Sequence, residues 1–252
     1  MDDIPAIIIG NDNITLNYFC MKLKLAKAMG PVRPGQFVMV KIPGSDVFLR
    51  RPFSIYESAR NTITVMYRVV GKGTELLSGL EPDQKTFVLG PLGNGFNIRQ
   101  RDEYLIIAGG IGIAGVRLLA KTLKQKARIF YGCSTKEELK VIEDLSRYNP
   151  SISTLDGSAG VKGNVVALFA KYMTGIAGKD AEVFTCGPDG MVRGLRKILE
   201  KTGTACQVLV EERMACGIGL CFGCVIKTVD EKEPYKRTCK EGPVFDLWQI
   251  SQ

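Results

Sequence analysis

The sequence has 252 residues, 45% of them apolar, which suffices for one large domain or two ordinary domains with hydrophobic cores. It contains no histidine, which excludes a Ser-His-Asp triad, a Cys-His pair and a His-ligated zinc site, and so favours electron or hydride transfer by a cofactor. The net charge of +8 is interrupted by acids, as in KTVDEKEPYKR, and predicts no nucleic-acid binding.

The N-terminus and the cysteine content indicate a compartment. No stretch of about 18 or more apolar residues occurs, so we expect no membrane span. The opening MDDIPAIIIG lacks the basic region and the cleavage site of a signal peptide, which predicts a cytoplasmic protein. In that reducing compartment, the 8 cysteines favour metal binding or redox chemistry over a disulfide framework.

Residues 1–100 are rich in short β-type runs that Gly, Pro, Asn and Asp separate. One helical turn, GTELLSGL, interrupts them. Such a succession of short strands predicts a small antiparallel barrel. The expected strands are AIIIG, YFCMKLKLA, GQFVMVKIP, FLRRPFSIY, NTITVMYRVV and KTFVLGPLG.

Two motifs in this region favour phosphate binding. In RRPFSIY, Arg51 precedes a stiff strand whose backbone can meet a flat ring. In YRVVGKGT, Gly71 and Gly73 precede a helical turn that we expect to begin at Thr74, and free N–H groups at a helix start bind pyrophosphate. Each motif alone has a plainer interpretation, a chance arginine in one case and a glycine hairpin turn in the other.

Residues 101–212 alternate strands with helices, which predicts a parallel, doubly wound sheet. The strand YLIIAGG ends in glycines, and AGVRLLAKTLKQ then shows helical periodicity. TKEELKVIEDLSRY predicts a second helix, with Thr135 as its N-cap and Glu138 completing a capping box. The remaining expected elements are the strands ARIFYG, SISTLD, AEVFTCG and CQVLVEE and the helices NVVALFAKYM and PDGMVRGLRKILEKTG.

The carboxyl edge of this sheet is the predicted dinucleotide site. IIAGGIGIAGV and FTCGPDGM each end a strand in glycines and open a helix, which is the context that a dinucleotide requires. No arginine lies within 5 residues after Gly132 to hold a 2′-phosphate, which favours NAD over NADP. The positions expected to meet the dinucleotide are Gly109, Gly110, Gly112, Gly187 and Pro188.

Half of the cysteines gather near the C-terminus, in the pattern C-x4-C-x2-C-x14-C formed by Cys216, Cys221, Cys224 and Cys239. Thiolates suit iron–sulfur clusters or zinc. Zinc ribbons present two C-x2-C knuckles, whereas this segment has one, and the x4-then-x2 spacing is typical of plant-type [2Fe–2S] ferredoxins. We therefore predict a [2Fe–2S] cluster, with a structural zinc as the alternative.

The motifs RPFS, GKGT, AGGIGIA and CGPDGM, in this order, resemble the ferredoxin–NADP reductase superfamily over residues 1–212. The tail, EERMACGIGLCFGC and YKRTCKEGPVFD, is similar to the electron-transfer subunits of type B dihydroorotate dehydrogenase. The expected organisation is an antiparallel FAD-binding β-barrel of residues 1–100, an NAD-binding α/β domain of residues 101–212 and a [2Fe–2S] segment of residues 213–252.

The resemblance also implies the cofactor contacts. It implies a nicotinamide-pocket position for Cys186, although a small apolar strand end explains that residue equally well. Because the flavin performs hydride transfer, no catalytic side chain is expected. The resemblance places FAD at Arg51, Pro52, Phe53, Ser54, Met66, Tyr67, Arg68, Gly73 and Thr74.

The function that the resemblance implies is electron transfer in pyrimidine biosynthesis. Electrons would pass from the FMN of a catalytic partner subunit, where dihydroorotate is oxidised, through the cluster and FAD to NAD. The expected assembly is a heterotetramer with two copies of each subunit. A reductase subunit of a hydrogenase or of a ferredoxin:NAD(P) oxidoreductase complex shares this layout, and a non-catalytic metal-binding module is a third reading. The GPVFD after Cys239 favours the dihydroorotate reading.

Overall fold

The computed structural model describes residues 3–44, 46–175 and 180–251. Six strands close into an antiparallel barrel in the order β1-β2-β5-β4-β3-β6, which confirms the predicted barrel. In β1, alternate residues enter the core, because Ile4, Ala6 and Ile8 are buried. The strands are β1 (Asp3–Thr15), β2 (Tyr18–Leu25), β3 (Phe37–Val40), β4 (Arg51–Ala59), β5 (Thr62–Arg68) and β6 (Lys85–Leu92).

The helical turn expected between the fifth and sixth strands is α1 (Lys72–Ser78). It begins at Lys72 and not at Thr74, so the expected start was wrong by two positions. The Thr74 hydroxyl accepts the backbone N–H groups of Val70 and Gly71 at 2.9 and 3.3 Å and donates to the Gly71 carbonyl at 3.0 Å. Thr74 therefore fixes the preceding turn from inside the helix.

The second unit is a seven-stranded sheet in the order β10-β9-β8-β7-β11-β12-β15. All its pairs are parallel except that of β12 with β15, which confirms the predicted parallel doubly wound sheet. The strands are β7 (Glu103–Gly109), β8 (Ala127–Cys133), β9 (Ser151–Thr154), β10 (Val161–Lys162), β11 (Ala181–Cys186), β12 (Ala205–Leu209) and β15 (Val244–Asp246).

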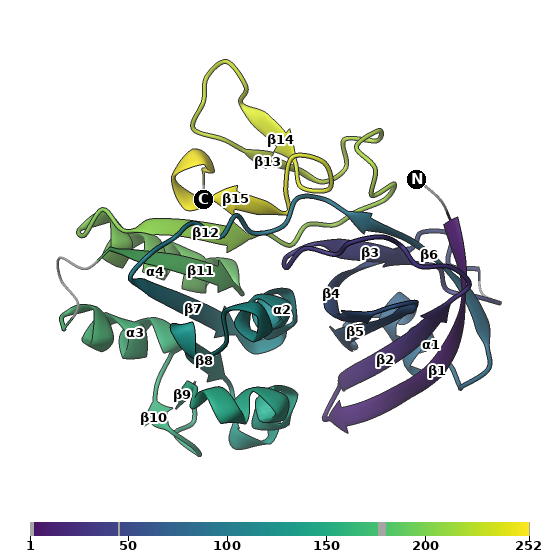
Figure 1. The fold of residues 1–252 in the computed structure, drawn as a ribbon, viewed down its shortest axis with the longest axis horizontal. Coiled ribbons are helices and arrows are strands. Elements are labelled where there is room, and N and C mark those ends of the chain that lie inside the picture. The colour runs from purple at the N-terminus through teal and green to yellow at the C-terminus, as the bar shows by residue number, and fades with distance from the viewer. Residues whose placement is uncertain (1–2, 45, 176–179, 252) are drawn as a thin grey trace.

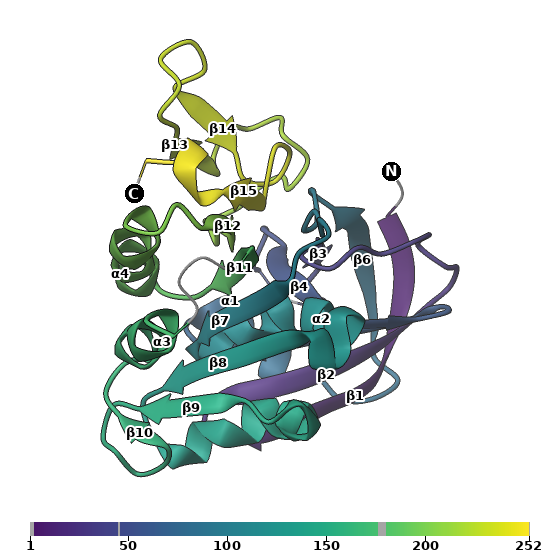
Figure 2. The ribbon, with the colours of Figure 1, turned by 60° about the vertical axis from the view of Figure 1, so that its left-hand side comes forward.

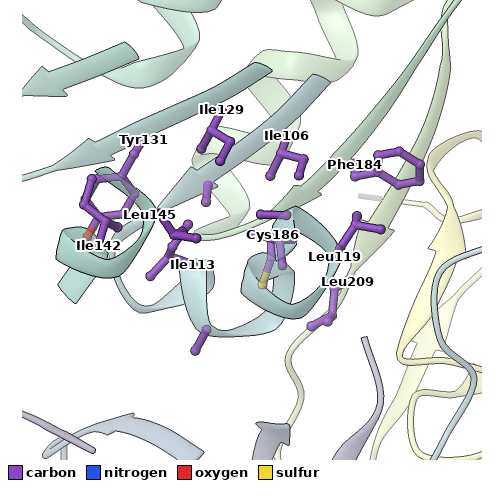
Figure 3. Close-up of a cluster of buried hydrophobic side chains, with 14 of the residues drawn as sticks. Ile106, Ile113, Leu119, Ile129, Tyr131, Ile142, Leu145, Phe184, Cys186 and Leu209 are labelled. Carbon is purple, nitrogen blue, oxygen red and sulfur yellow. The ribbon is translucent and has the colours of Figure 1, made fainter. Parts of the chain in front are cut away.

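Helices cover both faces of this sheet (Figures 1 and 2). Residues of β7 alternate between the two cores: Ile106 packs with α2 and η3, whereas Ile107 packs with α3 and α4. The first core also holds Tyr131, Phe184 and Cys186 (Figure 3). The helical elements are the 3-10 turns η1 (Gly110–Gly112) and η2 (Lys124–Lys126), α2 (Ile113–Leu123), the 3-10 helix η3 (Lys136–Tyr148), α3 (Val165–Met173) and α4 (Asp189–Glu200).

The helix expected over TKEELKVIEDLSRY forms as η3, but the predicted capping box does not. Thr135 makes no side-chain cap hydrogen bond. The carboxylate of Glu138 instead accepts the backbone N–H of Ser134 at 3.0 Å and, from the barrel, the hydroxyl of Tyr18 at 2.6 Å. A contact between the two units has thus replaced the local motif.

The C-terminal segment lies across both units (Figure 1). It forms the hairpin β13 (Val225–Lys227) and β14 (Tyr235–Arg237), then adds β15 to the edge of the sheet and ends with η4 (Leu247–Gln249). Hydrogen bonds between β12 and β15 cross the predicted boundary at residues 212 and 213, and the three-domain division stays a prediction. Within the described ranges, no helix combines the length and apolar character that crossing a bilayer requires.

Candidate functional site

A cavity of about 730 Å³ opens where the barrel, the α/β unit and the C-terminal segment meet. Arginine and lysine side chains dominate its charge, which suits a diphosphate. Besides Arg51 and Arg68, the lining cations are Arg50, Lys72 and Arg213. All the positions for which FAD contacts were predicted line this cavity: Arg51, Pro52, Phe53, Ser54, Met66, Tyr67, Arg68, Gly73 and Thr74.

Arg51 and Gly73 form a matched pair in the wall of this cavity. A Cβ atom at Gly73 would lie 2.3 Å from Arg51 Nε, so the guanidinium position requires glycine there. Arg51 donates to the carbonyl of Leu49 at 2.7 Å, which holds the guanidinium beside the start of α1. A fixed cation next to the open N–H groups of a helix start fits the pyrophosphate of FAD.

A second cavity, of about 330 Å³, lies at the carboxyl edge of the sheet. It collects the two predicted glycine turns, because β7 and β11 are neighbours that pair Ala108 with Cys186. The turns touch: a Cβ at Gly112 would lie 2.4 Å from the carbonyl oxygen of Cys186. The five predicted dinucleotide positions all line it: Gly109, Gly110, Gly112, Gly187 and Pro188.

The two cavities meet at a shared wall that includes Arg68 and Glu211. Glu211 is exposed toward the cavities but enclosed by protein elsewhere, and this burial raises the pKa of its carboxyl. The thiol of Cys186, wholly buried, lies 3.9 Å from Glu211 Oε1. Cys186 therefore lies behind the residues that line the cavities, and Glu211 stands between its thiol and the cavities.

Sequence reasoning missed Glu211, together with Arg50, Arg213 and Met214 at the larger cavity. A signal existed for Glu211, since it follows the last parallel strand and so falls at the carboxyl edge of the sheet. No comparable signal marked Met214, which reaches the larger cavity only because the C-terminal segment folds back over the barrel.

The four C-terminal cysteines come together as two pairs. The backbone N–H of Cys221 donates to Cys216 Sγ at 3.5 Å, and that of Cys239 donates to Cys224 Sγ at 3.4 Å. Despite some burial, backbone N–H donors lower the pKa of the Cys216 thiol to about 6, whereas burial and the adjacent Cys224 raise the pKa of Cys239 to about 12. Gly223 donates a further N–H to Cys221 Sγ at 3.4 Å.

Four thiols of this kind could hold either a structural zinc or a [2Fe–2S] cluster. Across residues 3–44, 46–175 and 180–251, no three Cys, His, Asp or Glu side chains are grouped to hold one metal ion. Two pairs, with backbone N–H groups aimed at sulfur, fit a [2Fe–2S] cluster, in which each iron takes two protein ligands.

The second thiol pair is also part of the core. Cys224 and Cys239 pack with Phe37, Met39 and Leu92 of the barrel. Phe37 in turn lines the larger cavity, as do Met214 and Pro243 of the C-terminal segment. One layer of side chains therefore links the second thiol pair to that cavity.

Comparison with known proteins gives the family. The iron-sulfur cluster binding domain of dihydroorotate dehydrogenase B matches residues 211–251. The dihydroorotate dehydrogenase B (NAD(+)) electron transfer subunit of Caldanaerobacter subterraneus subsp. tengcongensis is 37% identical over 214 residues, 84% of each chain. The chain belongs to this family of electron transfer subunits. A homolog from Aquifex aeolicus is 36% identical over 255 residues and matches 98% of each chain, so family membership extends over the whole fold.

Solved structures agree with this family assignment. The NADH-dependent reduced ferredoxin-NADP oxidoreductase described for flavin-based electron bifurcation superposes with a TM-score of 0.83 at 25% identity, covering 98% of this chain and 89% of that one. An Amycolatopsis cytochrome P450 reductase shares the fold, with a TM-score of 0.69 at 21% identity over 80% of this chain and 66% of that one. The resemblance found in the motifs is thereby confirmed.

Proposed function

We propose that this chain is the electron-transfer subunit of an NAD-dependent dihydroorotate dehydrogenase and connects an FMN-containing catalytic partner with NAD in pyrimidine biosynthesis. The observation that carries the proposal is the flavin cavity, whose wall combines barrel, α/β unit and cysteine segment. Bound FAD supplies hydride exchange with NAD, and a bound [2Fe–2S] cluster supplies single-electron exchange.

The residues of the chain bind and orient these groups. In this proposal Arg51 and the start of α1 hold the FAD pyrophosphate, while Phe53, Ser54 and Tyr67 face the ring system. The turns at Gly109 and Gly187 hold the dinucleotide of NAD against the shared wall. Cys216 and Cys221 hold one iron, and the remaining thiol pair holds the other.

We assign the oxidation of dihydroorotate to the partner subunit. That reaction removes a proton from carbon and needs a base beside the pyrimidine. The sequence has no histidine to act as that base, and the residues that line the two cavities suit the flavin and the dinucleotide. We propose an FMN subunit as the site of that step, in a heterotetramer with two copies of each chain, and a cytoplasmic location, where thiols stay reduced for cluster binding.

The test is reconstitution. The anaerobically purified chain should contain FAD, iron and sulfide, show a [2Fe–2S] EPR signal on reduction, and pass electrons from NADH to dyes without oxidising dihydroorotate. Adding the FMN subunit should create dihydroorotate-dependent NAD reduction. Oxidation of dihydroorotate by the isolated chain would overturn the division of labour between the subunits.

A second candidate is a subunit of a ferredoxin:NAD(P) oxidoreductase complex, because the solved structure with a TM-score of 0.83 bears that description. It predicts that reduced ferredoxin, and not an FMN subunit with dihydroorotate, supports NAD reduction. The same purified chain distinguishes the two candidates when each electron donor is supplied separately.

A further inference from the structure

Arg237 is the last residue of β14 and lies two positions before Cys239. Its backbone pairs with Val225, which follows Cys224. The residue is therefore built into the hairpin that carries the second thiol pair. Its side chain is only 20% exposed, which is unusual for an arginine on so small a segment.

The side chain of Arg237 reaches the loop that carries the first thiol pair. One guanidinium nitrogen donates to the carbonyl of Gly219 at 2.8 Å, and the guanidinium carbon lies 4.7 Å from the centre of the Phe222 ring. Gly219 lies between Cys216 and Cys221, and Phe222 directly follows Cys221. One side chain thus spans both halves of the cluster segment.

The two residues that Arg237 contacts have unusual backbones. Gly219 has a φ of +84° and Phe222 a φ of +56°. The left-handed region costs free energy for any residue with a Cβ atom, so Phe222 needs outside contacts to keep this conformation. The cation over its ring is such a contact.

Glu241 fixes the guanidinium in turn. Its Oε2 accepts the Arg237 Nε–H at 3.1 Å and the Arg237 backbone N–H at 2.7 Å, and its other oxygen accepts from the second guanidinium nitrogen. Arg237 and Glu241 therefore form an ion pair in which both carboxylate oxygens meet the guanidinium.

The guanidinium of Arg237 lies close to the thiol pairs, because it donates to the Gly219 carbonyl between Cys216 and Cys221 and belongs to a residue two positions before Cys239. A [2Fe–2S] cluster with four thiolates is anionic in both redox states and gains one more negative charge on reduction. A nearby cation therefore favours the reduced state, and a nearby carboxylate opposes it.

We propose that Arg237 is a positioning residue of the cluster: it ties the two thiol pairs together through Gly219 and Phe222, and its charge, opposed by Glu241, sets the midpoint potential. The inference rests on the cluster of the proposed function. It assigns the guanidinium two separable tasks, one geometric and one electrostatic.

The experiment compares substitutions that separate charge from geometry. Arg237→Met removes the positive charge and the hydrogen bonds of the guanidinium. Arg237→Lys keeps the charge but loses the planar set of N–H donors and the contact with the Phe222 ring. Glu241→Gln keeps a hydrogen-bond acceptor and removes the negative charge. Lys236→Met is the matched control, because Lys236 is an adjacent, 27% exposed cation that pairs with Glu233 at 3.8 Å. Iron and sulfide content, the EPR line shape and an EPR-monitored redox titration are measured for each purified chain.

We expect Arg237→Met to lower the reduced-to-oxidised ratio at a given solution potential about tenfold, which is about 59 mV for a one-electron couple. Glu241→Gln should shift the ratio in the opposite direction, and Lys236→Met should leave it unchanged. Arg237→Lys should stay near the parent potential but show a changed EPR line shape and faster loss of iron in air.

The electrostatic task would be overturned if Lys236→Met and Arg237→Met changed the midpoint potential by the same amount. It would also be overturned if Arg237→Met and Glu241→Gln changed that potential in the same direction. An unchanged line shape and iron retention in Arg237→Lys would overturn the geometric one. If Arg237→Met binds no cluster, the Glu241→Gln and Arg237→Lys results still decide both tasks. A parent chain without iron would instead refute the proposed function.

Discussion

At the scale of single residues, the proposed flavin cavity depends on a few side chains whose positions restrict which residues can stand beside them. Arg51 can lie beside the start of α1 only because position 73 has no side chain. Its guanidinium is held by the carbonyl of Leu49 and has no carboxylate partner among the ion pairs of the described residues. An arginine oriented in this way is suited to an anionic ligand.

Arg51→Ala should therefore weaken FAD binding. A charge-assisted contact to phosphate contributes about 1.5–3 kcal/mol, which corresponds to roughly 10- to 150-fold in affinity. The measurement is flavin release on dilution, followed by fluorescence. Arg60→Ala is the control, because Arg60 lies in the β4–β5 turn away from both cavities. Equal retention of FAD by both variants and the parent would show that Arg51 does not contact the cofactor.

At the scale of elements, local sequence signals predicted the barrel and the parallel sheet, but contacts between distant segments decided the rest. The succession of short β-type runs in the barrel and the glycine-ended run of β7 are short-range signals that the structure keeps. The predicted cap at Thr135 does not form, and Glu138 bonds Tyr18 of the barrel, 120 positions away in the chain. β15 was missed because its three residues form a strand only against β12.

The elements of the two units are also joined by a buried arginine in α2. Arg117, whose side chain is 6% exposed, donates to Asp144 Oδ2 of η3 at 2.7 Å and to the Tyr56 carbonyl of β4 at 2.7 Å. Its guanidinium lies 3.9 Å from the centre of the Tyr56 ring. β4 carries the flavin motif, so this contact fixes the motif relative to the nucleotide unit.

Arg117→Met should destabilise the protein by about 2–3 kcal/mol. Breaking a fully buried ion pair lowers the free energy of unfolding by about 3–5 kcal/mol. The expected loss here is smaller, because Asp144 remains 38% exposed and water partly replaces its lost partner. Urea unfolding followed by circular dichroism measures the change. Arg128→Met is the control, since the Arg128 side chain is 65% exposed in its pair with Glu103. Equal destabilisation by the two substitutions would contradict the role of Arg117 between the units.

At the scale of the whole molecule, the cysteine segment has one face against the barrel and one face in solvent. The inner face contains Cys224 and Cys239, packed on Met39. The outer face exposes large apolar side chains around the first thiol pair, with Leu220 75% and Phe222 61% exposed. Since electron transfer requires the carriers of two subunits to be close, this outer face is the expected contact with the FMN subunit.

Phe222→Asp should weaken that complex by about 30-fold or more, because an exposed aromatic residue at the centre of an interface typically contributes at least about 2 kcal/mol. Affinity for the FMN subunit is measured by titration of preparations matched for iron and FAD content, because the Phe222 ring also contacts Arg237 beside the thiols. Leu155→Asp is the matched control, because Leu155 is 57% exposed on the α/β unit, away from the cysteine segment. If Phe222→Asp binds the partner as tightly as the parent, the docking face lies elsewhere, although the two-subunit function would stand. If both substitutions weaken binding alike, the effect is one of added negative charge on a chain of net charge +8 and not of this face.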